Sequence, residues 1–161
     1  MKTFAYITLA VLLVIVCGGC SDSDEMPSEP LLPVTANNLA GVWRLKTWQE
    51  AERPAESFVY IEFIRKDQRF RLYQNLDSFG PVQKSGRFAI TTDEHLGAIL
   101  HGEYDFSYNQ QWNNRYVVHD LTQHSMTWVA VGNEHDISVY ERCEALPSEI
   151  ESLFPNTDGA D

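Results

Sequence analysis

A succession of short β-type runs, with almost no helical periodicity between them, most constrains how this chain can fold. Runs rich in β-branched and aromatic residues recur about every ten to twelve positions, and turn residues such as Gly80 and Pro81 separate them. Only Ser148 to Glu151 has the spacing of a capping box, which predicts a short helical turn over 148–153. The expected strands are 42–49, 58–65, 69–75, 84–91, 96–102, 114–121, 125–131 and 136–142.

A sheet of eight strands without covering helices must close on itself or fold over to bury its apolar face. The sequence therefore predicts an all-β domain, either an eight-stranded antiparallel up-and-down barrel or, as the alternative, a β-sandwich. Alternation assigns one face of each strand to the interior; in 69–75, for example, Phe70 and Leu72 lie opposite Arg71. The inward face of a barrel would consist of Leu45, Ile61, Phe63, Phe70, Leu72, Phe88, Ile90, Tyr116, Val118, Met126 and Trp128.

These inward positions allow two interpretations. An eight-stranded barrel is either filled by its own side chains or holds one small ligand. Many of the positions carry large aromatic residues, so a filled core and a ligand pocket remain equally good hypotheses. The pocket hypothesis predicts a cavity of about 300 Å³ or more.

The N-terminus contains two cysteines in C-x-x-C spacing, Cys17 and Cys20. A redox dithiol would need a strand–helix junction of a folded domain, and a four-cysteine zinc site would need more than the one remaining cysteine, Cys143. Here the cysteines instead follow Lys2 and an apolar run over 4–16. That run has the length of a signal-peptide core and is shorter than the roughly 20 residues that span a bilayer.

The order of Lys2, the apolar run, two small glycines and Cys20 resembles the lipobox of bacterial lipoproteins, although Cys17 stands where leucine is usual. The resemblance implies that residues 1–19 are a signal peptide and that Cys20 becomes the acylated first residue. The acidic residues 21–25 are similar to the tags that carry some lipoproteins to the outer face of the outer membrane. We therefore expect a lipid-anchored protein of the bacterial outer membrane, exposed at the surface.

Charge is distributed unevenly along the chain, whose formal net charge is −11. Residues 21–35 contain four acids and no bases, and residues 144–161 contain five acids and no bases. Residues 36–143 are closer to balance, with 14 acidic and 11 basic residues, and no basic cluster suggests a nucleic-acid partner. We expect an acidic, proline-containing tether over 20–36, a domain over 37–154 and a disordered tail over 155–161.

The first and last expected strands carry a recognisable pair. Gly41 and Trp43 form a G-x-W motif at the start of the first strand, and Arg142 ends the last. This pattern resembles the lipocalins, in which the arginine packs across the tryptophan at the barrel floor. The resemblance implies a lipocalin-like (calycin) barrel that binds a small hydrophobic or amphipathic ligand. It is incomplete, because the family's T-D-Y motif and its disulfide are absent.

Residues with reactive side chains do not form a recognisable catalytic or metal-binding pattern. The five histidines lack the short spacings of common metal sites, and Cys143 lies between acidic residues that oppose thiolate formation. No serine or cysteine lies in a nucleophile motif. We therefore expect no enzyme activity, no metal and no cofactor.

The stretch 104–112 is the best candidate for a binding rim, through Tyr104, Phe106, Tyr108 and Trp112. Two functions follow from it. A small ligand could enter the barrel at this end, or the rim could present an exposed apolar patch to a macromolecular partner, with the barrel as a scaffold. The sequence does not identify a protein partner.

Overall fold

The structure is a computed structural model that describes residues 29–154, apart from 53, 55, 77–78 and 107–110. The expected signal peptide 1–19, the lipidation site Cys20, the first part of the tether, Tyr108 and the tail 155–161 lie outside the described residues. Among the described residues, no helix is both long and apolar enough to cross a membrane.

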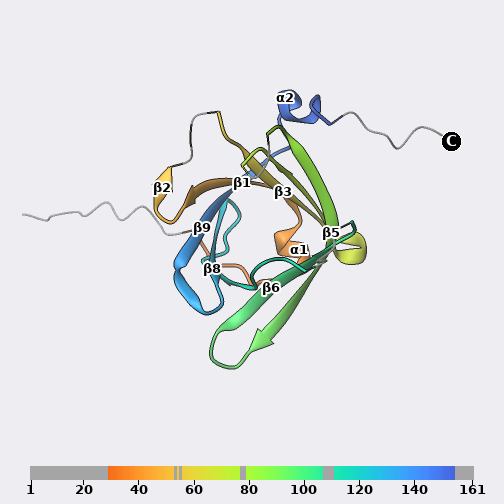
Figure 1. Ribbon diagram of the computed structural model, residues 1–161. Helices are drawn as coiled ribbons and strands as arrows, with labels where there is room; N and C mark the ends of the chain where they lie inside the picture. Colours follow the sequence, from red (N-terminus) through yellow and green to blue (C-terminus); the bar gives the residue numbers. More distant parts are fainter. Residues whose placement is uncertain (1–28, 53, 55, 77–78, 107–110, 155–161) are drawn as a thin grey trace, which may run out of the picture.

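One antiparallel sheet contains all the strands and closes because β1 pairs with β9 as well as with β3 (Figure 1). The strands are β1 (Gly41–Trp48), β2 (Ala51–Glu52), β3 (Val59–Ile64), β4 (Arg69–Gln74), β5 (Val82–Asp93), β6 (Gly97–Tyr104), β7 (Tyr116–His119), β8 (Ser125–Ala130) and β9 (Asn133–Cys143). The helical elements are α1 (Ala36–Leu39), the 3-10 turn η1 (Lys66–Gln68) and α2 (Ser148–Glu151).

Eight of these strands form the barrel, and β2 is a two-residue addition paired with the end of β1. The predicted up-and-down barrel is therefore confirmed, and the β-sandwich alternative is wrong. All eight expected strands are present, whereas β2 and α1 were not expected. Two-residue strands and single helical turns contain too few residues to show a hydrophobic period.

The connections between strands fall into two groups, because each strand runs opposite to its neighbours. One end of the barrel, which we call the floor, contains the start of β1, the end of β9 and the connections after β3, β5 and β7. The other end, which we call the mouth, contains the connections after β1, β4, β6 and β8. The expected binding rim over 104–112 belongs to the mouth.

The floor contains the contact that the G-x-W pattern predicted. The guanidinium carbon of Arg142 lies 4.0 Å from the ring centroid of Trp43, which is completely buried. Gly41 has a φ of +118°, and a Cβ at this position would lie 2.8 Å from Arg142 Nη1. A residue without a side chain is therefore required where the first strand passes the arginine.

The chain before β1 also covers the floor. The backbone N–H of Leu32 donates to Leu121 O over 2.7 Å, and Leu32 and Val34 pack against the barrel core. Glu29 accepts a hydrogen bond from the backbone N–H of Gln123 and lies 2.8 Å from His124 Nδ1. The last part of the segment expected to be a tether thus contacts the barrel, and α1 continues it across the ring of strands (Figure 1).

The floor half of the interior is a packed core. Phe63 and Phe88 meet edge to face at 4.9 Å, and Met126 lies beneath Trp128, whose Nε1 is 3.3 Å from the methionine sulfur. Leu100 is also fully buried among these residues. Aromatic and aliphatic side chains of this size leave no ligand space at the level where they meet.

The helix α2 lies on the outside of the barrel (Figure 1). Its Ile150 packs against Val42, Tyr60 and Tyr73 on the outer faces of β1, β3 and β4. This contact explains why β3 is apolar on both faces: one face belongs to the barrel core and the other is covered by the C-terminal segment.

Candidate ligand-binding site

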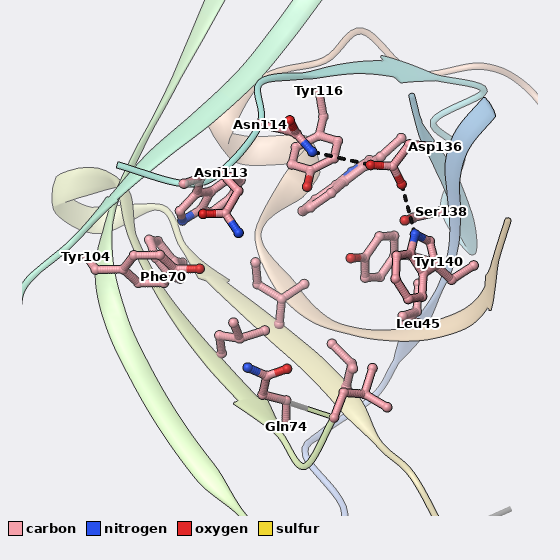
Figure 2. A pocket seen from close by; sticks show the side chains of 17 residues that line it. Leu45, Phe70, Gln74, Tyr104, Asn113, Asn114, Tyr116, Asp136, Ser138 and Tyr140 are labelled. Atoms are coloured by element: carbon pink, nitrogen blue, oxygen red, sulfur yellow. Dashed lines mark hydrogen bonds between the residues drawn. The ribbon is translucent and has the colours of Figure 1, made fainter. Parts of the chain in front are cut away.

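The mouth half of the barrel contains an open cavity of about 320 Å³ (Figure 2). It lies above the packed floor half, and every barrel strand except β5 contributes residues from its mouth end. The lining consists of Leu45, Trp48, Val59, Ile61, Phe70, Leu72, Gln74, Leu76, Tyr104, Trp112, Asn113, Asn114, Tyr116, Trp128, Asp136, Ser138 and Tyr140.

An irregularity in β1 brings Trp48 into this lining. Strict alternation from Trp43 and Leu45 would place Thr47 inside and Trp48 outside. The pairing of β1 with β9 shifts register between Leu45 and Thr47, so that Trp48 lies opposite Ser138, another lining residue. The shift has the effect of a β-bulge, which redirects side chains near the end of a strand.

Aromatic rings form much of the cavity wall. The rings of Trp112 and Trp128 stack at 5.8 Å with an interplanar angle of 26°, and Phe70 meets Trp112 edge-on at 5.0 Å. Tyr116 lies 5.2 Å from Trp128, and Tyr104 meets Phe70 edge-on at 5.6 Å. Such contacts hold the rings in fixed positions, so the cavity has a preformed, flat-sided wall.

Trp112 reaches the interior from the connection between β6 and β7. Its backbone N–H donates to Gly102 O over 2.8 Å, and its indole packs directly on the glycine. A Cβ at Gly102 would lie 2.3 Å from Trp112 Cε2, so only glycine leaves room for the ring. The indole Nε1 is buried and has no hydrogen-bond partner among the described residues.

A polar cluster occupies one side of the mouth, around Asp136 (Figure 2). Trp48 Nε1 donates to one carboxylate oxygen over 2.8 Å, and Asn114 Nδ2 donates to the other over 3.3 Å. Burial raises the pKa of the Tyr116 hydroxyl, and a hydrogen bond with Asn114 acts in the opposite direction. The tyrosine is therefore a neutral hydrogen-bonding group near neutral pH.

Asp136 is the one charged residue among those that line the cavity in the described part of the chain. A basic residue stands near the opposite wall: Lys84 lies across from Leu72 in the β4–β5 pairing, on the same face of β5 as the buried Phe88, and its Nζ is 5.6 Å from the ring centroid of Tyr104. Figure 2 shows Asp136 and Tyr104 on opposite sides of the cavity. The cavity thus combines an apolar, aromatic body with a single acidic group at its mouth.

The structure divides the expected lining residues between two levels of the barrel. Six line the cavity: Leu45, Ile61, Phe70, Leu72, Tyr116 and Trp128. Phe63, Phe88, Val118 and Met126 are buried in the packed core below it, and Ile90 is partly buried against the same core. The interior is therefore filled by side chains in its floor half and open as a cavity in its mouth half.

The residues expected to form the rim differ in whether they point into the cavity or into solvent. Tyr104 and Trp112 turn inward and line the cavity, so they do not form the exposed patch that the macromolecular alternative required. Phe106 is 96% exposed on the same connection. Tyr108 lies outside the described residues.

The polar lining residues were not expected from the sequence. Asp136 and Ser138 share the inward face of β9 with Tyr140, at two-residue spacing from Arg142. Since Arg142 was assigned to the inward face at the floor, the two-residue alternation of β9 would have predicted that Tyr140, Ser138 and Asp136 also point inward. Alternation places Gln74 on the same face of its strand as Phe70 and Leu72, but as a polar residue it was left out of the expected lining, and the structure shows that it lines the cavity.

Comparisons with known proteins give one structural likeness. No family model matches this chain, and no curated protein sequence matches it. Among solved structures, the chain is similar to a lipocalin-like protein from Bacteroides uniformis, with 18% sequence identity and a TM-score of 0.47. The alignment covers 66% of this chain and 99% of the other. With its closed eight-stranded antiparallel barrel and its Trp43–Arg142 floor, this chain has a lipocalin-like fold.

Proposed function

We propose that this protein is a non-enzymatic binding protein that holds a small, partly apolar molecule in the mouth half of its barrel. The observation that carries the proposal is the open cavity of about 320 Å³. Its volume is within the range of small-molecule sites, about 300 to 1,000 Å³. Like those sites, it has apolar and aromatic walls interrupted by a few polar side chains, which include Asp136 and Asn114 at the mouth and Gln74 on β4 (Figure 2).

The N-terminal sequence supports a location for this binding protein. We propose that Cys20 carries a lipid anchor and that residues 1–19 are removed, which would hold the barrel at the bacterial outer membrane, facing outward. The acidic residues 21–25 support the outward orientation. An anchor with more than one acyl chain gives stable membrane attachment without a spanning protein segment.

Native mass spectrometry of residues 21–161 tests ligand binding directly. The protein is measured under native and denaturing conditions, before and after incubation with an extract of lipids and small metabolites. We expect an additional mass of a few hundred daltons that is lost on denaturation. A native mass equal to the denatured mass under every condition would refute the proposal.

A matched pair of variants connects the bound mass to the cavity. Leu72→Trp adds a large ring to the cavity wall, whereas Leu153→Trp makes the same change at a side chain that is 47% exposed beyond α2. We expect the first variant to lose the additional mass and the second to keep it. Equal loss or equal retention would show that the ligand is bound elsewhere.

A second function is supported by two exposed aromatic residues at the mouth. Phe79 and Phe106, on the connections after β4 and β6, are 115% and 96% exposed. Exposed aromatic rings on neighbouring connections suit a macromolecular contact. A pull-down from cell-envelope extract would compare the wild type with Phe79→Ser/Phe106→Ser, using Leu96→Ser at the floor end as the control. A partner that the double variant still captures would argue against this function.

A further inference from the structure

We infer that the cavity selects a ligand with a flat apolar body and a positively charged amine head, and that it disfavours carboxylate amphiphiles such as fatty acids. The inference deepens the proposed binding function and depends on it. It rests on Asp136, the one charged lining residue in the described part of the chain, and on the aromatic rings beside it.

The carboxylate of Asp136 is held in place but is not saturated. Trp48 Nε1 donates to Oδ1 over 2.8 Å and Asn114 Nδ2 donates to Oδ2 over 3.3 Å. Each carboxylate oxygen accepts about two hydrogen bonds, so each retains room for a donor from a ligand. Because both partners are neutral, the negative charge of Asp136 remains uncompensated by these contacts, and an ammonium group would provide both donors and the opposite charge.

The rings near this carboxylate suit a cation rather than an anion. The Trp48 indole N–H is hydrogen-bonded to Asp136. Tyr116 is part of the same polar cluster because it is hydrogen-bonded to Asn114. The faces of such rings attract an ammonium group. A ligand carboxylate in the same place would meet the like charge of Asp136 and the negative ring faces.

The shape and volume of the rest of the cavity indicate what kind of apolar group the ligand would carry. Stacked Trp112 and Trp128, with Phe70 edge-on to Trp112, form a flat part of the cavity wall. The volume of about 320 Å³ is near the lower limit of small-molecule sites. A compact body of one or two fused rings therefore fits the space better than a long acyl chain.

Lys84 is the group that could oppose this selectivity. Its Nζ lies 5.6 Å from the ring centroid of Tyr104, and Figure 2 shows Tyr104 on the side of the cavity opposite Asp136. Lys84 is not among the residues that line the cavity. Its charge already faces the tyrosine ring in a cation–π contact. An anionic ligand would have to draw Lys84 away from this contact, so a Lys84 variant belongs in the test.

Three probes with the same body and different heads test the inference: 2-(1-naphthyl)ethylamine, 2-(1-naphthyl)ethanol and 1-naphthaleneacetate. Isothermal titration calorimetry on residues 21–161 at pH 7 would give the three dissociation constants. We expect the amine to bind about tenfold more tightly than the alcohol, and the acid to bind most weakly. Asp136→Asn should remove the tenfold advantage of the amine, whereas binding of the alcohol should stay within about twofold and report that the variant is folded. Lys84→Met should leave amine binding unchanged.

Other outcomes are equally informative. Tightest binding of the acid, lost in Lys84→Met, would overturn the inference and leave the binding function intact. Equal binding of the three probes, or an Asp136→Asn variant that keeps the amine advantage, would also overturn it. If none of the probes binds, the amine selectivity is refuted, and the mass of co-purified ligand decides separately whether the cavity holds a ligand.

Discussion

A single side chain, Arg142, joins the three parts of the chain that form the barrel floor. Its Nε donates to Gln123 O over 2.7 Å, in the connection before β8. Its two terminal nitrogens donate to Asn38 O and Ala40 O, just before β1, and its planar face stacks on Trp43. Burial lowers the pKa of this guanidinium, but arginine stays charged at any physiological pH. Three N–H groups of one planar guanidinium reach three carbonyl oxygens at once, which explains why arginine is required here.

Arg142→Met should lower the free energy of unfolding by about 2–4 kcal/mol. The methionine keeps apolar contact with Trp43 but leaves carbonyl oxygens without their donors, at a cost of about 1–3 kcal/mol for each buried group. Arg142→Lys should recover only part of the loss, because an ammonium group cannot reproduce the planar fork. Urea denaturation of the three proteins measures the difference. A loss below about 0.5 kcal/mol in the methionine variant would contradict the assigned role.

Gly102→Ala should reduce ligand affinity more than it reduces stability. The new methyl group would occupy space now filled by the Trp112 indole, at 2.3 Å from Cε2, and would push the ring into the cavity. We expect at least a tenfold weaker affinity for the ligand found by mass spectrometry, with an altered tryptophan fluorescence spectrum. Gly80→Ala is the control, because a Cβ there would have no heavy atom within 4 Å. Equal affinities of the two variants would show that Trp112 does not shape the site.

At the scale of elements, the segment before α1 is part of the barrel's structure. Its side chains alternate, with Leu32 and Val34 facing the core and Leu31 68% exposed. The backbone bond from Leu32 to Leu121 fixes this alternation, as a ladder bond does in a strand. The segment therefore covers apolar surface at the floor that would otherwise face water.

Leu32→Ala should cost about 1–2 kcal/mol of stability, because a partly buried leucine loses most of its apolar contact. Leu31→Ala makes the same change one residue earlier, at an exposed side chain, and should stay within about 0.5 kcal/mol of the wild type. Thermal and urea unfolding of the two variants provide the comparison. Equal losses would mean that the segment does not pack on the floor in solution.

Asp105, just after β6, connects three neighbouring strands. Ser85 Oγ in β5 lies 2.6 Å from its carboxylate, and Arg69 in β4 donates to the same oxygen. The hydrogen bond from Ser85, and then the contacts with Arg69, hold the pKa of Asp105 below its usual value. Since the folded-state pKa lies below the unfolded value of about 3.9, the charged form contributes stability at pH above about 4. That contribution disappears as the pH falls through the folded-state pKa.

Asp105→Asn should therefore be less stable than the wild type at pH 7, by less than about 1 kcal/mol for this partly exposed pair. The difference should shrink as the pH falls toward 2, where the wild-type carboxyl group is also neutral. Urea denaturation at several pH values measures it. Ser152→Ala, at an exposed position near α2, serves as a pH-insensitive control. A difference that does not change with pH would show that the charge of Asp105 is not responsible.

At the scale of the whole molecule, the barrel is filled at one end and hollow at the other. The floor half is closed by the Trp43–Arg142 contact and packed by residues such as Phe63 and Met126. The mouth half keeps the open cavity. Filling the floor provides the buried apolar area that stabilises the domain, and it leaves the mouth free for a ligand without loss of the core.

The proposed lipid anchor makes a prediction for the intact protein in a bacterial host. Cys20→Ser should abolish acylation, whereas Cys17→Ser should leave it unchanged, because only Cys20 follows the small residues of the cleavage site. Intact mass measurement of protein extracted from membranes would detect the acyl chains and the removal of residues 1–19. Acylated Cys20→Ser, or loss of acylation in Cys17→Ser alone, would contradict the assignment.

The strand positions, the barrel floor and the inward direction of most apolar side chains could be predicted from the sequence, but not which of them line the cavity and which fill the core. Strand alternation is a local property, so it identified inward residues such as Ile61 and Leu72 before any contact was known. The position of Trp48 could not be predicted, because it depends on a register shift between β1 and β9. Trp112 could not be assigned to the interior either, because its position depends on Gly102, ten residues away on β6.

The sequence by itself determined that the chain forms an all-β domain, since eight amphipathic runs without covering helices must close into a barrel or fold into a sandwich to bury their apolar faces. The pairing of β1 with β9 in the tertiary structure decided for the barrel. The G-x-W motif and terminal arginine determined the floor. Only the tertiary structure decided how far up the barrel the side chains fill the interior, and that Asp136, Trp48 and Asn114 meet at the mouth. The physical reason is that strand alternation alone decides whether a side chain points into the barrel. Whether the barrel interior is filled depends on the summed volumes of side chains from strands that are far apart in the chain.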